Sequence, residues 1–240
     1  MRAARGRQTR RWNVGNRGDR PGLVAKASPK WPLAFFADVK RGRPDMTDAK
    51  YQDRQNLEIF CWPELMKIFQ GLVELVMLSP GSVSRQLRSE LFTMASIAGG
   101  CQHCQAHGAY TLHMMGVDPE RIRDIWSFEQ STEFSDGEKA ALRLARDGAL
   151  VPNMVAPEHF AALRRHYSDR HIVEMLSVIS LAGWYNRWNN SIATVTDRES
   201  VEWAEANLKA VGWELGKHAG ATHEQRRKHP RSTDPDRIEY

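Results

Sequence analysis

Apolar positions repeat with the spacing of an amphipathic helix through most of the chain between residues 63 and 213. Leu65, Ile68, Phe69 and Leu72 follow the i, i+3, i+4, i+7 pattern that lets a helix present one apolar face. No stretch shows the period-two alternation that is typical of a half-buried strand. The pattern therefore predicts an all-α fold, a bundle of about seven or eight helices.

Capping and turn residues divide this region into separate helices. Ser79-Pro80-Gly81 ends the first, and Asp118-Pro119 supplies a cap followed by a first-turn proline. Ser135 is a similar cap, and Gly116 stops the helix before Asp118. We expect helices over about 63–78, 84–98, 101–115, 119–126, 136–150, 157–167, 170–194 and 198–213.

The distribution of charge suggests three parts. The chain has 240 residues, of which 41% are apolar, and a net charge of +5. Residues 1–45 hold 12 Lys and Arg against 3 Asp and Glu, whereas residues 46–216 hold 16 against 22 and residues 217–240 hold 6 against 4. We expect a disordered basic arm over 1–45, a helical domain over 46–216 and a disordered polar tail over 217–240.

Composition also narrows the class of function. The acidic helical region argues against a nucleic-acid partner, because a binding domain of that kind carries its positive charge on the folded face. No apolar run approaches the ~20 residues that span a membrane, so we expect no membrane partner. The chain has only three cysteines, which fits a reducing compartment with one redox pair, and we expect a cytoplasmic protein.

Cys101 and Cys104 form the most informative motif of the chain, directly after Gly99-Gly100. A glycine pair followed by Cys-x-x-Cys predicts a loop that becomes a helix, with both sulfurs in its first turn. The unpaired N–H groups and positive dipole end of a helix favour a thiolate over a thiol. A thiolate is the nucleophile in peroxide attack and in disulfide exchange.

Three further residues are candidates for moving the proton. His107 shares a helix face with Cys104 and with His103, and Glu90 lies in the middle of the preceding helix. In the expected relay, Glu90 orients a histidine, which takes the proton from one thiol. The thiolate then attacks a peroxide, and the second cysteine closes a disulfide. This chemistry needs no cofactor and no metal.

Other readings of the motif stay open at this point. Structural zinc usually needs a second ligand pair, which the sequence lacks. Covalent haem attachment needs histidine directly after the second cysteine, where Gln105 stands. The cysteines could be buried and inert, Glu90 a solvated residue, and His103 a surface or supporting group. The polar and aromatic run 186–190 indicates either an interface or a pocket wall.

The motif and its surroundings resemble the carboxymuconolactone decarboxylase and alkylhydroperoxidase D (AhpD-like) superfamily over about residues 60–195. The superfamily pattern is a glutamate, eleven residues, Cys-x-x-Cys, three residues and a histidine. Here ten residues separate Glu90 from Cys101, and two residues separate Cys104 from His107. The similarity also covers the segments 135–142 and 172–176 and the pair Asn186-Arg187.

The resemblance implies a fold, an assembly and roles for the site residues. It implies an all-α, AhpD-like bundle that forms homo-oligomers. Cys104 would be the peroxide-attacking cysteine, Cys101 the resolving cysteine, and Glu90 and His107 the relay, with His103 able to replace the histidine. An external dithiol of the thioredoxin or lipoyl type would supply the electrons.

Three functions follow from these expectations. The first is a thiol-dependent peroxidase or disulfide oxidoreductase that acts on a hydroperoxide. The second is a decarboxylase-type lyase that acts on a lactone and does not need the cysteine pair. The third is a helical oligomer without catalytic activity, in which the disulfide acts as a redox sensor.

Overall fold

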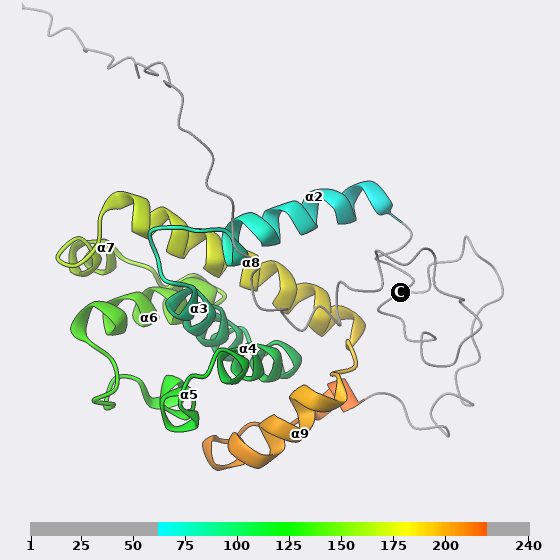
Figure 1. Ribbon diagram of the computed structural model, residues 1–240. Coiled ribbons are helices and arrows are strands. Elements are labelled where there is room, and N and C mark those ends of the chain that lie inside the picture. The colour runs from blue at the N-terminus through cyan, green and yellow to red at the C-terminus, as the bar shows by residue number, and fades with distance from the viewer. Residues whose placement is uncertain (1–61, 220–240) are drawn as a thin grey trace, which may run out of the picture. The chain divides into compact units, whose positions relative to one another are not determined.

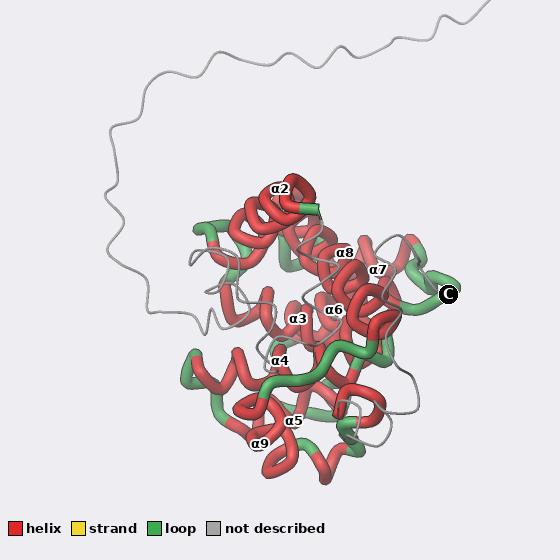
Figure 2. Tube along the Cα trace, turned by 90° about the vertical axis from the view of Figure 1, so that its right-hand side faces the viewer, coloured by secondary structure: helices red, strands yellow, loops and turns green. Residues whose placement is uncertain are grey.

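The computed structural model describes residues 62–219, and within that range every regular element is helical (Figures 1 and 2). The predicted all-α class is therefore confirmed. A π-helical segment Glu74–Leu78 continues α2, and single 3-10 turns cover Ile125–Ser127, Lys209–Val211 and Gly216–Ala219. The eight α-helices of this range are α2 Pro63–Val73, α3 Arg85–Ala98, α4 Gln102–Met114, α5 Pro119–Asp124, α6 Asp136–Ala149, α7 Pro157–Leu163, α8 Asp169–Ile192 and α9 Arg198–Asn207.

Helix α3 is the centre of the bundle and packs against α4, α6 and α8. It is buried on several faces, and two of its buried hydroxyl groups bond to carbonyl groups of the same helix. Thr93 donates its hydroxyl hydrogen to the Ser89 carbonyl at 2.8 Å, and Ser96 donates to the Phe92 carbonyl at 2.8 Å. Burial without these bonds would cost free energy for each hydroxyl. A central helix can therefore carry polar side chains close to the candidate site.

The expected helix starts agree with the observed caps. The Ser84 hydroxyl accepts from the Leu87 N–H at the start of α3, and Asp118 accepts from the Glu120 N–H before α5. Ser135 and Glu138 form a reciprocal capping box at α6. None of the helices in residues 62–219 is long and apolar enough to cross a membrane.

The ends of two helices and the end of the helical domain differ from the expected positions. Helices α7 and α9 end at Leu163 and Asn207, earlier than predicted, because short turns follow them. The described structure also continues past the expected domain end at residue 216, because the side chain of His218 is fully buried. The basic arm predicted over 1–45 and most of the tail predicted over 217–240 lie outside the described residues.

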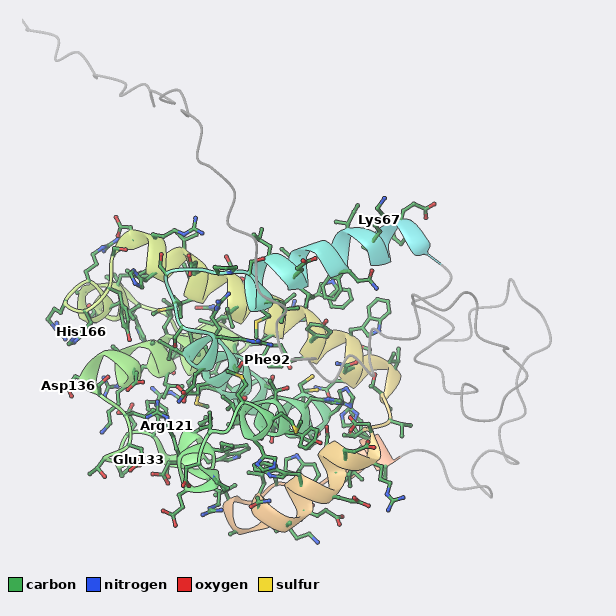
Figure 3. The ribbon with its side chains drawn as sticks, in the orientation of Figure 1. Lys67, Phe92, Arg121, Glu133, Asp136 and His166 are labelled. Carbon is green, nitrogen blue, oxygen red and sulfur yellow. The ribbon has the colours of Figure 1, made fainter. Side chains whose placement is uncertain are left out.

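Glu90 faces a different partner from the one expected. Its side chain is only 1% exposed, and its carboxylate accepts from Arg121 Nε at 2.8 Å and from Gln86 Nε2 at 2.9 Å. Arg121 also bonds Glu138 and the Glu133 carbonyl (Figure 3 labels Arg121 and Glu133). The pair joins α3 to α5 and α6, which gives Glu90 a structural reason to be buried.

We expect Arg121→Gln to lower the free energy of unfolding by about 3 kcal/mol, because it leaves the buried Glu90 carboxylate without its ion-pair partner. Urea unfolding followed by the helical circular dichroism signal measures this loss. Arg165→Gln, which removes an exposed arginine, serves as control and should change stability by less than about 0.5 kcal/mol. The double variant Glu90→Gln/Arg121→Gln should recover part of the loss. An equal loss in single and double variants would contradict a coupled pair.

Candidate redox site

The turn between α3 and α4 places the cysteine pair. The N–H of Cys101 donates to the Ser96 carbonyl, and the N–H of Gly100 donates to the Ile97 carbonyl, both at 3.1 Å. These two bonds form a Schellman motif, which requires a left-handed residue at its centre. Gly100 takes that conformation with φ of +65°. The predicted loop-to-helix transition is thus observed, and α4 starts directly after Cys101.

The two sulfurs lie in direct contact at the start of α4. Cys101 is the N-cap residue, and its Sγ accepts from the Cys104 N–H at 3.3 Å. The two Sγ atoms are 2.6 Å apart, and Asn189 Nδ2 of α8 donates to Cys104 Sγ at 3.3 Å. Both residues are buried, Cys101 completely and Cys104 with 2% exposure. The pair is therefore enclosed, with polar groups rather than hydrocarbon against its sulfurs.

The surroundings shift the pKa values of the two thiols in opposite directions. Hydrogen bonding from the Cys104 thiol lowers the pKa of Cys101, with further help from backbone N–H groups and from the positive charge of Lys217. Burial and the contact with Cys101 raise the pKa of Cys104 well above its usual value. Cys101 is thus the sulfur that ionises first, and Cys104 the thiol that donates to it. This polarity is opposite to the roles that the resemblance implies.

His103 and His107 form a polar cluster with the residues that precede α9. His107 Nε2 lies 2.7 Å from Asp197 Oδ2 in an ion pair, and His103 Nδ1 lies 3.0 Å from Thr196 Oγ1. The two imidazole centroids are 4.3 Å apart. Burial, together with the neighbouring charge of His107, lowers the pKa of His103 well below its usual value, so His103 is neutral.

Asp197 keeps its negative charge despite partial burial. Burial would raise the pKa of its carboxyl group, but contact with His107 and bonds from Ser200 hold that pKa far below the usual range. Asp197 also caps α9 by accepting from the Ser200 N–H at 2.9 Å. One carboxylate therefore fixes both the start of α9 and the ring of His107.

The residues after α9 cover the first turn of α4. Trp213 Nε1 donates to the Gln102 carbonyl at 3.0 Å, and Lys217 Nζ donates to the Asn190 carbonyl at 2.6 Å. His218 lies between Thr194 and Asn190, with Nδ1 2.7 Å from the Thr194 carbonyl oxygen and Nε2 3.2 Å from Asn190 Oδ1. We call residues 213–218 the covering segment.

The structure brings together four of the five predicted site residues. Cys101, Cys104, His103 and His107 share the first two turns of α4, whereas both oxygens of Glu90 are bonded to Gln86 and Arg121. Sequence reasoning missed four groups that act on this cluster. Asn189, Thr196 and Asp197 contact it through their side chains, and Lys217 acts on Cys101 through its positive charge. Asp197 carried one signal, because an aspartate before a helix reads first as a cap. Within residues 62–219, no three His, Cys, Asp or Glu side chains form a group that could hold a metal.

Comparison with known proteins agrees with this geometry. Residues 63–147 match the carboxymuconolactone decarboxylase family. A crystal structure of an alkylhydroperoxidase AhpD core, an uncharacterised peroxidase-related protein from Ralstonia eutropha JMP134, superposes with a TM-score of 0.56 at 20% identity, over 73% of this chain and 93% of that one. Residues 63–147 are therefore similar to this family, and the fold of the chain is that of the AhpD core.

Two further proteins that are similar to this chain are informative. The uncharacterised protein YdfG of Bacillus subtilis (strain 168) is 27% identical over 126 residues, which cover 52% of this chain and 84% of YdfG. The crystal structure of the debrominase Bmp8 superposes with a TM-score of 0.58 at 24% identity, over 64% of this chain and 80% of Bmp8. At these identities the two solved structures support the fold alone.

The chain departs from the relay pattern that the resemblance implies. Counted from the cysteines, spacers of eleven and three residues fall on Ser89 and Gly108, and neither side chain can relay a proton at neutral pH. Ser89 Oγ lies 3.8 Å from Met115 Sδ. A Cβ on Gly108 would lie 2.4 Å from Thr93 Oγ1, so the packing of α3 on α4 excludes a histidine there. The His107–Asp197 pair is the nearest acid–base group that remains.

We expect the two thiols to differ in reactivity when each is left alone. In a Cys61→Ser background, Cys104→Ser leaves Cys101 with a hydroxyl donor in place of the thiol, so its pKa stays low. Cys101→Ser leaves Cys104, whose pKa is raised. At neutral pH, alkylation by iodoacetamide should be at least about tenfold faster for Cys101, since one pKa unit changes the thiolate fraction tenfold.

The pH dependence of the alkylation rate provides the check. Thiolate is lost as the pH falls below the pKa, so the Cys101 rate should reach half of its maximum below the free-thiol value of about 8.5, and the Cys104 rate above it. Alkylation of the urea-unfolded variants is the reference in which both thiols should behave alike. A faster Cys104 in the folded protein would reverse the assignment.

Proposed function

We propose that the chain is a thiol-dependent oxidoreductase that reduces a hydroperoxide through Cys101 and Cys104. The observation that supports this most strongly is the contact of the two sulfurs at 2.6 Å, with opposite pKa shifts, at the start of a helix. The family match over residues 63–147 and the structural similarity to a peroxidase-related protein add support.

The reaction starts at the sulfur that is ionised at rest. The Cys101 thiolate attacks the distal oxygen of the hydroperoxide, the O–O bond breaks, and the products are a sulfenic acid and an alkoxide that takes a proton to become an alcohol. The Cys104 thiol then displaces hydroxide from the sulfenic acid, which leaves as water with the thiol proton and closes a disulfide. The peroxide gains two electrons, and the two cysteines lose two.

His107 and Asp197 supply the proton in this scheme. Asp197 orients the ring of His107, which can protonate the departing alkoxide and take up a new proton from solvent because its side chain is 34% exposed. Neutral His103 lies beside His107, with ring centroids 4.3 Å apart, and can pass a proton through its ring. The relay uses Asp197, which follows α8, in place of Glu90.

Substrate access requires a movement of the covering segment. Cys101 has no exposed surface, and Trp213 and Lys217 are bonded next to the first turn of α4. Opening of such a segment is a common step in enzymes that exclude water during reaction. The same opening would admit an external dithiol of the thioredoxin or lipoyl type, which reduces the disulfide and completes the cycle.

We further infer a homo-oligomer that works in a reducing compartment such as the cytoplasm. Ile68, Leu72 and Leu75 are exposed apolar residues on one face of the segment formed by α2 and its π-helical extension. An exposed apolar stripe of this kind is typical of an interface between protein chains. The scarcity of cysteines supports the compartment.

A lyase reaction on a lactone is the second candidate. The family match and the His107–Asp197 pair favour it, because an oriented histidine can move a proton without any thiol. The two candidates separate cleanly in the double variant Cys101→Ser/Cys104→Ser. Lactone turnover would survive that change, whereas peroxide reduction would be lost.

We expect peroxide reduction with a dithiol donor to fall to background in Cys101→Ser and in Cys104→Ser, since each removes one half of the disulfide. Consumption of cumene hydroperoxide, followed with dithiothreitol as donor, measures it, and Cys61→Ser is the matched control that should keep full activity. Wild-type activity in Cys104→Ser would reject the proposed function. Redox-dependent oligomer size without turnover would instead indicate a sensor.

The relay has its own test. His107→Asn should lower kcat/KM for the peroxide by about 10²-fold, the lower range for loss of a general acid. Asp197→Asn keeps the α9 cap but removes the carboxylate that orients the ring of His107, so it should lower the same kcat/KM in the same direction. Glu90→Gln should leave kcat/KM near the wild-type value in protein of native circular dichroism. A loss of kcat/KM in Glu90→Gln and none in Asp197→Asn would restore the predicted relay.

A further inference from the structure

A pocket of about 1150 Å³ lies beside the redox site and is not used by the chemistry above. It is bounded by the end of α6 with the loop after it and by the second half of α8, two helices that can be followed in Figures 1 and 2. Gly99, two residues before Cys101, forms part of its wall. The pocket is therefore adjacent to the turn that positions the cysteines.

One wall of the pocket is aromatic. Trp184 and Trp188, one helical turn apart on α8, are stacked with ring centroids 5.0 Å apart and planes at 10°. The indole Nε1 of Trp188 is buried without a hydrogen-bond partner. Leu150 and Val151 from the loop after α6 supply apolar surface and are both exposed. A flat aromatic ring suits such a wall.

The pocket has a single charged lining residue, Arg187. It is exposed, and within residues 62–219 it has no ion pair or hydrogen bond, whereas its lining neighbours include no carboxylate. Asn186, next to it, is 4% exposed, lines the pocket and has an unpartnered buried Oδ1. A planar carboxylate is the group that arginine binds best, through two parallel bonds.

We propose that this pocket binds an aromatic carboxylate, with the ring against Trp184 and Trp188 and the carboxylate on Arg187. The pocket also touches the thiol site through α8. Asn190 donates to the Gly100 carbonyl at 3.4 Å, and the preceding Asn189 donates to Cys104 Sγ. Neighbouring residues of α8 therefore connect the pocket wall to the cysteine pair. The proposal concerns binding and does not rest on the proposed peroxidase activity.

Isothermal titration with 2-naphthoate tests the site, with 2-naphthamide as the neutral ligand of the same shape. The wild type should bind naphthoate at least about tenfold more tightly than naphthamide, the preference expected for one charge-assisted pair. Arg187→Gln should remove that preference, and Trp188→Leu should weaken both ligands. Arg165→Gln, the loss of an exposed arginine elsewhere, should change neither affinity. Cys104→Ser should bind as the wild type does, which separates binding from thiol chemistry.

Three outcomes would overturn the proposal. These are equal affinity for the two ligands, an unchanged preference in Arg187→Gln, or no binding at millimolar naphthoate by protein of native circular dichroism. Gel filtration of Arg187→Gln distinguishes the competing occupant. If that variant elutes as a smaller species than the wild type and neither binds naphthoate, the surface is an interface between copies of the chain.

Discussion

The candidate site depends on one backbone constraint, the Schellman turn that ends α3. Gly100 must take a left-handed conformation for the Cys101 N–H to reach the Ser96 carbonyl. That bond makes Cys101 the N-cap of α4, and the cap position brings its sulfur to the Cys104 N–H and thiol. Any side chain at position 100 would strain the turn and displace both sulfurs together.

The bundle separates two groups of charges along its central helix. Arg121, Glu90 and Glu138 tie α5 and α6 to the first half of α3, away from the bonds that surround the sulfurs. The polar groups around the cysteines come instead from α8 and from the residues after it. The charged groups that hold the fold are therefore distinct from those that tune the thiols.

The sequence predicted what depends on local pattern and missed what depends on distant contacts. Apolar periodicity and caps such as Ser84 and Ser135 located the helices, and the Gly-Gly-Cys-x-x-Cys motif located the thiols. The sequence predicts Glu90 as part of the relay because helical spacing indicates the face that a residue occupies. Spacing does not indicate which cation lies opposite that face. Asp197 and Lys217 reach the site only through folding of the chain after α8, and neither has a motif. The turn Gly216–Ala219 extends past the domain end predicted at residue 216. In the sequence His218 resembles any polar residue of a tail, and its burial depends on contacts that only the structure reveals.

The capping role of Cys101 has a consequence for the energetics of electron exchange. Its sulfur accepts from a helix N–H and benefits from Lys217 only while it carries negative charge. Closing a disulfide removes that charge and with it the stabilisation. Stabilising the reduced form of a dithiol makes its disulfide a stronger oxidant. In the proposed reaction, the first turn of α4 would therefore favour transfer of electrons from a donor to the cysteine pair, because it stabilises the reduced state and not the disulfide.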